Sequence, residues 1–250
     1  MSLDPLHQFE IHHYGQVDVM GYTVAVTNQS VWVMGITLGL CALMILGTRP
    51  RQMVPGPVQS ALEMAFEFVE NMITSTAGRE GLKFFPFVFT LFTFIATCNL
   101  FGLVPGAYTS TSQITVTGSL ALLVFAIVWI VGLTHHGIKF FTLFAPAGTP
   151  GWMLPVIVPL ELISFFARPF TLAVRLTANM LAGHVLLKVF AGFAILLLGA
   201  LGVEGGLLAS TMPAAMLIAV TALELFVALL QAYIFTILTC VYLNDAIHLH

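Results

Sequence analysis

Long apolar stretches alternate with short polar ones along this chain of 250 residues. A helix needs roughly 20 apolar residues to cross the hydrocarbon core of a bilayer. Uncharged stretches of that kind predict transmembrane helices at 30–48, 84–104 and 114–134. The last two are divided by residues 103–112, where Pro, Gly, Ser and Thr gather as they do in a turn.

Two further apolar stretches, 155–199 and 206–243, are longer and contain charged residues. As helices they would measure roughly 67 and 57 Å, about twice the thickness of the hydrocarbon core. We therefore predict two long membrane helices that tilt, kink or protrude. Pro159 and Pro169 supply kinks within the first of them. A division of 155–199 into two short spans is the alternative.

The segment 57–77 has the pattern of a surface helix. Glu63, Glu67 and Glu70 recur at i, i+4 and i+7, opposite an apolar stripe. This spacing predicts an amphipathic helix, and its acidic polar face favours a protein partner over anionic lipid. The fold predicted for 1–250 is a single membrane domain, all-α and polytopic, with about five transmembrane helices and one amphipathic surface helix.

The composition excludes most other classes of protein. Charged residues make up 8% of the chain, against about 25% in a soluble domain, and the mean hydropathy is +1.01. A soluble enzyme is excluded. Binding to nucleic acid is not expected either, because the chain has only eight basic residues and a net charge of −3. The chain has no phosphate-binding or dinucleotide motif, so we expect no nucleotide site of its own and no cofactor. Its paired histidines lack a second set of ligands, so we expect no metal site.

The basic residues predict the orientation in the membrane. Residues 1–28 and 103–113 contain no Lys or Arg, whereas the connection after the first span contains four basic residues: Arg49, Arg51, Arg79 and Lys83. By the positive-inside rule, the segment 1–28 lies outside and this connection lies inside. Five spans then place the C-terminus inside.

Charges within the predicted spans are the main functional signal, since an Arg at the centre of a bilayer costs about 3 kcal/mol on insertion scales. Glu161, Arg168 and Arg175 are spaced by seven residues, which places them on one side of a helix together with Asn179. His184 falls on the opposite side. An ion pair of Arg175 with Glu224 within the chain is one explanation. The other is an anion supplied by a partner subunit or a substrate.

The last predicted helix has a polar side of its own, because Glu224 and Gln231 are also seven residues apart. A Glu and a His on adjacent spans can both gain and lose protons near neutral pH. Glu224 and His184 are therefore candidates for a proton path.

Four segments resemble subunit a of the F-type ATP synthase, in its mitochondrial and related bacterial form. They are AVRLTANMLAGH (173–184), LELFVALLQAYIFTILTCVYLNDA (223–246), CNLFGLVPGAYTSTSQ (98–113) and EFVENM (67–72). The resemblance covers nearly the whole chain after residue 30. It implies a stator subunit in a bacterial or mitochondrial inner membrane, with c-ring subunits, b-type peripheral stalk subunits, other ATP synthase subunits and the lipid bilayer as its partners.

The same resemblance implies roles for individual residues. Arg175 would face the rotating ring of c subunits and separate two proton half-channels, with Asn179 beside it and Gln231 near the same interface. His184 and Glu224 would line one half-channel. Two further residues would lie on the proton routes: Glu161 on the inner side and Asn99 on the opposite side. Where some family members have an acid, this chain has Gly102, which leaves the outer entrance to other groups.

Two alternatives to this function follow from the residues. A secondary proton or cation transporter also buries Arg, Glu and His, but it usually contains inverted repeats, and the pattern of 155–199 has no second copy. A sodium-coupled version of the same synthase subunit is the other, because the choice of ion depends largely on the surroundings of the ring carboxylate.

Overall fold

The computed structural model describes residues 12–19, 22–49, 56–104, 106–144, 152–200 and 202–248. Within these residues, five helical segments are long and apolar enough to cross a membrane. The prediction of a predominantly helical polytopic membrane protein is therefore confirmed.

A small β-hairpin precedes the helices, which the sequence reading did not predict. Strand β1 (His13–Val19) pairs antiparallel with β2 (Tyr22–Thr27), and Gln16 lies opposite Ala25. Helix α1 (Asn28–Gly47) follows directly. Its start is fixed by a capping box, in which the Thr27 side chain accepts from the Ser30 N–H at 3.3 Å and the Ser30 hydroxyl oxygen accepts from the Thr27 N–H at 2.9 Å.

The amphipathic segment forms helix α2 (Pro57–Gly81), which has a left-handed residue at Gly78, with φ 65°. Val69, Met72 and Ile73 on its apolar side are buried, whereas Glu67 is exposed. This division matches the amphipathic helix that the sequence predicted. The short 3₁₀ helix η2 (Leu82–Phe84) then leads into α3 (Phe85–Gly102). Helix α2 packs against both α3 and α6.

The next part of the chain forms a further helical stretch, which packs against α5 and α6. It consists of the 3₁₀ turn η3 (Ser110–Ser112), helix α4 (Ile114–His136) and the 3₁₀ segment η4 (Gly137–Phe144). Phe140 is fully buried against Gly132, where an added Cβ would lie 2.7 Å from the ring atom Cζ. A glycine is needed there for η4 to fold back onto α4.

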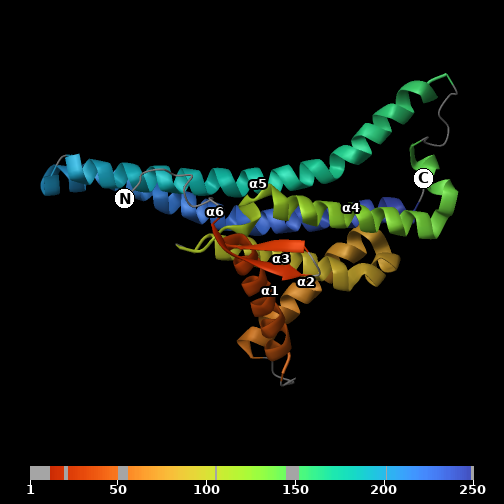
Figure 1. Ribbon diagram of the computed structural model, residues 1–250, viewed down its shortest axis with the longest axis horizontal. Helices are drawn as coiled ribbons and strands as arrows, with labels where there is room; N and C mark the ends of the chain where they lie inside the picture. The colour runs from red at the N-terminus through yellow and green to blue at the C-terminus, as the bar shows by residue number, and fades with distance from the viewer. Residues whose placement is uncertain are drawn as a thin grey trace.

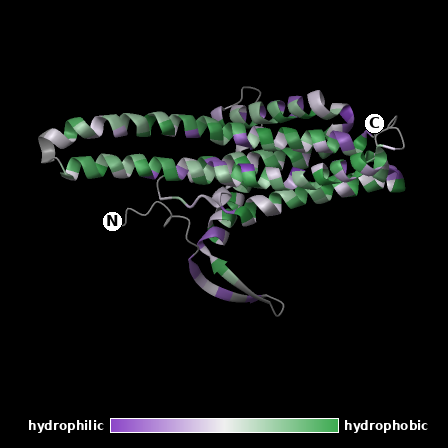
Figure 2. Ribbon diagram, turned by 90° about the horizontal axis from the view of Figure 1, so that it is seen from above, coloured by the Kyte–Doolittle hydropathy of each residue, from purple (hydrophilic) through white to green (hydrophobic). Residues whose placement is uncertain are grey.

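Two long helices form an antiparallel hairpin, α5 (Leu154–Ala200) and α6 (Gly202–Ile247). They make the most extensive contact between any two elements and extend well beyond the ends of α3 and α4, while α1 runs crosswise to all four (Figure 1). Helix α5 bends in its first third, where Pro159 and Pro169 interrupt its hydrogen bonds. Both helices are apolar over most of their length (Figure 2).

Candidate functional site

Arg175 lies on the outer surface of α5. Its side chain is exposed, while Leu176 beside it and Met180 one turn later are buried. Among the described residues, no hydrogen bond or ion pair holds the guanidinium. The proposed intrachain pair with Glu224 does not form, because Glu224 is buried and approaches His184 instead. Two apolar side chains of the same helix, Phe170 and Val174, are also exposed.

His184 and Glu224 meet in the contact between the two long helices. Both are buried, and the Nε2 atom of His184 lies 3.9 Å from Oε1 of Glu224. The approach depends on Gly183, because a Cβ added there would lie 2.7 Å from the carboxyl carbon of Glu224. Both carboxylate oxygens of Glu224 are buried and have no hydrogen-bond partner within the described part of the chain. A buried carboxyl group without partners is high in energy when charged, so a proton or water can bind there.

Asn99 of α3 reaches the same region of α6. Its Nδ2 atom donates a hydrogen bond of 3.0 Å to the carbonyl oxygen of Ala228, which lies one turn after Glu224. Gln231 is buried on the same side of α6. The side-chain oxygen of Asn99 is also buried without a described partner. The structure thus brings Asn99, Glu224 and Gln231 onto one buried polar strip.

The turn between α3 and α4 is buried rather than exposed. Residues 108–112 all have 7% or less of their surface accessible, and η3 packs on α5. The hydroxyl of Thr109 lies 3.0 Å from Nε2 of His184. Burial raises the pKa of the Tyr108 phenol, and a hydrogen bond from Gln113 partly offsets this rise. The turn therefore stays uncharged while it adds hydroxyl groups to the region of His184.

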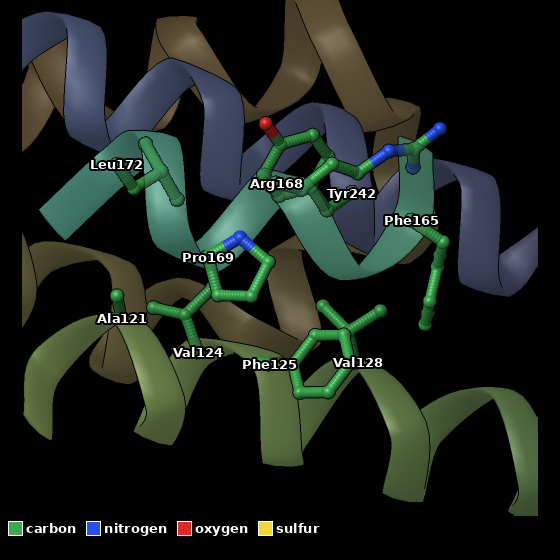
Figure 3. Close-up of a pocket in the computed structure, with 9 residues that line it drawn as sticks. All are labelled: Ala121, Val124, Phe125, Val128, Phe165, Arg168, Pro169, Leu172 and Tyr242. Carbon is green, nitrogen blue, oxygen red and sulfur yellow. The ribbon is translucent and has the colours of Figure 1, made fainter. Parts of the chain in front are cut away.

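A second polar cluster lies at the other end of α5. Arg168 donates a 3.0 Å hydrogen bond to Oδ2 of Asp245 and lies 3.8 Å from a carboxylate oxygen of Glu161. Its guanidinium also stacks over Tyr242, 5.1 Å from the ring centroid. Figure 3 shows Pro169 facing α4, while the Arg168 guanidinium points away toward α6. Arg168 is therefore neutralised within the chain, whereas Arg175 has no such partner in the part of the chain that the structure describes.

These two clusters flank Arg175 along α5. Arg175 lies seven residues after Arg168 and nine before His184, which correspond to roughly 10 and 14 Å along a helix axis. A single helix therefore carries, between two separate polar regions, a cation that has no ion pair with any described residue. One region lies at Glu161 and Asp245 and the other at His184 and Glu224.

The profile of the ATP synthase A chain family matches residues 30–244. The chain belongs to this family. Three proteins called ATP synthase subunit a illustrate the similarity. That of Rhodopseudomonas palustris (strain TIE-1) is 54% identical over 249 residues, and that of Bradyrhizobium diazoefficiens is 50% identical over 252 residues, with 99% of both chains covered in each case. That of Mesorhizobium japonicum is 50% identical over 249 residues, which are 99% of this chain and 97% of the relative.

The predicted family and function are thereby confirmed. This ATP synthase A chain is a multi-pass membrane protein of the Fo sector, where its family translocates protons, and it works with other ATP synthase subunits. The structure places the predicted residues in three groups. They are the strip with Asn99, Glu224, Gln231 and His184; the isolated Arg175, with half-buried Asn179 one turn along; and Glu161 beside Arg168.

Sequence reasoning missed two contributors to these groups. Asp245 pairs with Arg168 without any signal from local spacing; it is the last acidic residue of the chain and lies near the end of α6. Thr109 lies in a segment whose composition predicts only a turn. The sequence feature that could have indicated its role is the run of four hydroxyl residues at 109–112, which is more than a short connection between two membrane helices needs.

Proposed function

We propose that this chain provides two proton half-channels and places Arg175 against the ring of c subunits, so that proton flow drives rotation and ATP synthesis. The outer half-channel contains His184, Glu224 and Asn99, and the inner one contains Glu161. Asn179 and Gln231 adjoin the interface with the ring. The b-type peripheral stalk subunits hold the chain in place, in a bacterial or mitochondrial inner membrane with the N-terminus outside and the C-terminus inside.

The mechanism follows from the energy of a carboxylate in a membrane. A ring carboxylate that faces lipid has to be protonated, because a lone charge in hydrocarbon is unstable. Near a cation or water it can ionise. In the synthesis direction, a protonated carboxylate that reaches the inner half-channel therefore releases its proton into that half-channel. It passes Arg175⁺ in the ionised form and then takes up a new proton from the outer half-channel. Each proton that crosses a potential of about 100 mV supplies about 2.3 kcal/mol, which the complex stores as rotation.

The position of Arg175 is the observation that carries the proposal. Its guanidinium is exposed at an apolar surface without an ion pair in the described chain, and it lies between two separate polar clusters. A cation of this kind is stable in a membrane only beside an external anion or water. Because the two clusters are separated along α5, a fixed positive charge between them also repels a proton that would pass directly from one to the other.

Substitution of Arg175 tests the proposal in membrane vesicles that contain the whole synthase. We expect Arg175→Ala to abolish ATP synthesis and ATP-driven proton pumping, with near-normal amounts of assembled complex on immunoblots. Arg175→Lys should fail as well, because an ammonium lacks the planar fork of the guanidinium. The control is Arg79→Ala, which removes an exposed arginine of α2. Coupled synthesis near the parental rate in Arg175→Ala vesicles would contradict the proposal.

A further inference from the structure

One ring nitrogen of His184, Nε2, faces both a hydroxyl group and a carboxylate. Its Nε2 atom lies 3.0 Å from the hydroxyl oxygen of Thr109 and 3.9 Å from Oε1 of Glu224. Thr109 is buried, and its hydroxyl also lies 3.4 Å from the carbonyl oxygen of Gly102, to which it can donate. The hydroxyl can therefore accept a hydrogen bond from His184 in one orientation and donate one to it in another.

Buried hydroxyl groups continue from Thr109 along the turn. The side-chain oxygens of Ser110 and Thr111 are inaccessible from outside and have no hydrogen-bond partner in the described chain. The Ser112 hydroxyl donates to the carbonyl oxygen of Thr109 at 2.6 Å. Buried polar groups in proteins are nearly always satisfied, and where protein partners are missing, ordered water usually supplies the bonds. The unpartnered hydroxyls of Ser110 and Thr111 thus indicate water in the turn next to Thr109.

The residue at position 102 makes this arrangement possible. A Cβ added to Gly102 would lie 2.8 Å from Cγ2 of Thr109 and 3.2 Å from its hydroxyl oxygen. Any side chain at 102 would therefore occupy the place where the Thr109 side chain now lies. In this chain, the side chain of Thr109, with its hydroxyl group, occupies the space next to the Cα atom of Gly102.

We propose that Thr109 is a relay hydroxyl, which passes protons between water at the 110–112 turn and His184. This inference rests on the proposed function and extends the outer half-channel by one named step. In the synthesis direction, a hydronium ion gives a proton to the hydroxyl oxygen of Thr109 while the hydroxyl passes its own proton to Nε2 of His184.

The imidazolium then gives the Nε2 proton to the carboxylate of Glu224. A small rotation of either side chain closes the 3.9 Å gap. Rotation of the Thr109 hydroxyl restores the starting arrangement. One proton has then moved from water to Glu224, and His184 and Thr109 are unchanged.

Three substitutions at Thr109 separate a relay from packing. Ser keeps the hydroxyl, Ala leaves a polar space that a water molecule can enter, and Val keeps the shape but removes the hydroxyl. A relay predicts proton flux in the order Ser, then Ala, then Val, with Val at least about tenfold below the parent. A packing role predicts the opposite order for the last two, because Ala creates a cavity and Val does not.

The assay measures ATP-driven pumping and passive proton flux in vesicles with the whole synthase, divided by the amount of assembled subunit. The matched control is Thr93→Val, which changes a buried threonine of α3 that bonds only to the backbone of its own helix in the described structure. Parental flux in Thr109→Val, loss of flux in Thr109→Ser, or less flux with Ala than with Val would each overturn the relay. Arg175→Ala is measured alongside. If one of these outcomes occurs and Arg175→Ala also pumps normally, the proposed function itself fails. If one of them occurs and Arg175→Ala does not pump, only the relay fails.

Discussion

Substitution of Gly183 by alanine tests the pairing of His184 and Glu224 without removing any polar group. Gly183 lies within α5, where its backbone is helical, so alanine fits the local conformation. The added methyl group would lie 2.7 Å from the carboxyl carbon of Glu224 and 3.2 Å from its Cγ. Glu224 then has to move away from α5.

The size of the effect follows from these distances. Ordinary van der Waals contact begins at 3.4 Å, so the carboxyl carbon has to move by about 0.7 Å. Overpacking of this kind typically destabilises a core by about 1–3 kcal/mol. Misplacement of a reacting group by about 1 Å can lower a rate up to about 100-fold. We therefore expect proton flux to fall by roughly tenfold to 100-fold, more steeply than the amount of assembled complex.

The assay is ATP-driven pumping in vesicles, followed by a pH-sensitive dye and divided by the amount of assembled subunit. Gly199→Ala is the control, because it makes the same change in α5 at a position where no atom lies within 4 Å of the new methyl group. That variant should pump like the parent and is expected to be slightly more stable, since alanine favours a helix over glycine. Parental flux in Gly183→Ala would refute the reasoning that Glu224 has to remain against α5.

Three further outcomes are expected. Arg168→Gln or Asp245→Asn should each lower the stability of the subunit by about 1.5–3 kcal/mol, as thermal denaturation in detergent can show, and the double variant should cost less than the sum of the two. Gly132→Ala should destabilise the fold by about 1–3 kcal/mol in the same assay, because the aromatic ring packed on it cannot move into open space. In a variant without native cysteines, a membrane-impermeant maleimide should label Tyr14→Cys from outside and Glu80→Cys from inside; the reverse pattern would overturn the orientation.

The membrane helices could be predicted because the bilayer imposes a simple requirement on the sequence. Each span needs a long apolar stretch, and these stretches are visible without any knowledge of tertiary contacts. Helical periodicity also predicted that Arg175 and His184 face opposite sides of one helix, and the structure shows one exposed and the other buried. The spacing of residues in the sequence was therefore sufficient to predict features that depend on one helix alone.

Contacts between distant segments could not be predicted in this way. The partner of Arg168 depends on where the end of α6 falls beside α5, 77 residues later in the chain. The turn at 109–112 has the composition of an exposed connection, and its packing against α5, α3 and α4 makes it a buried polar region. The hairpin before α1 lies within residues 1–28, for which the hydropathy pattern predicts only a segment outside the membrane.

The exposed guanidinium of Arg175 has a consequence for the life of the subunit before it joins the synthase. A newly inserted copy presents this cation to lipid, with no carboxylate in the described chain to neutralise it. The penalty is about 3 kcal/mol on insertion scales, a sizeable fraction of the stability of a typical domain. We expect the orphan copy to open locally more often and to be degraded faster by membrane proteases than the assembled copy. Under the proposed function, binding of the ring supplies the missing anion and protects the subunit from degradation.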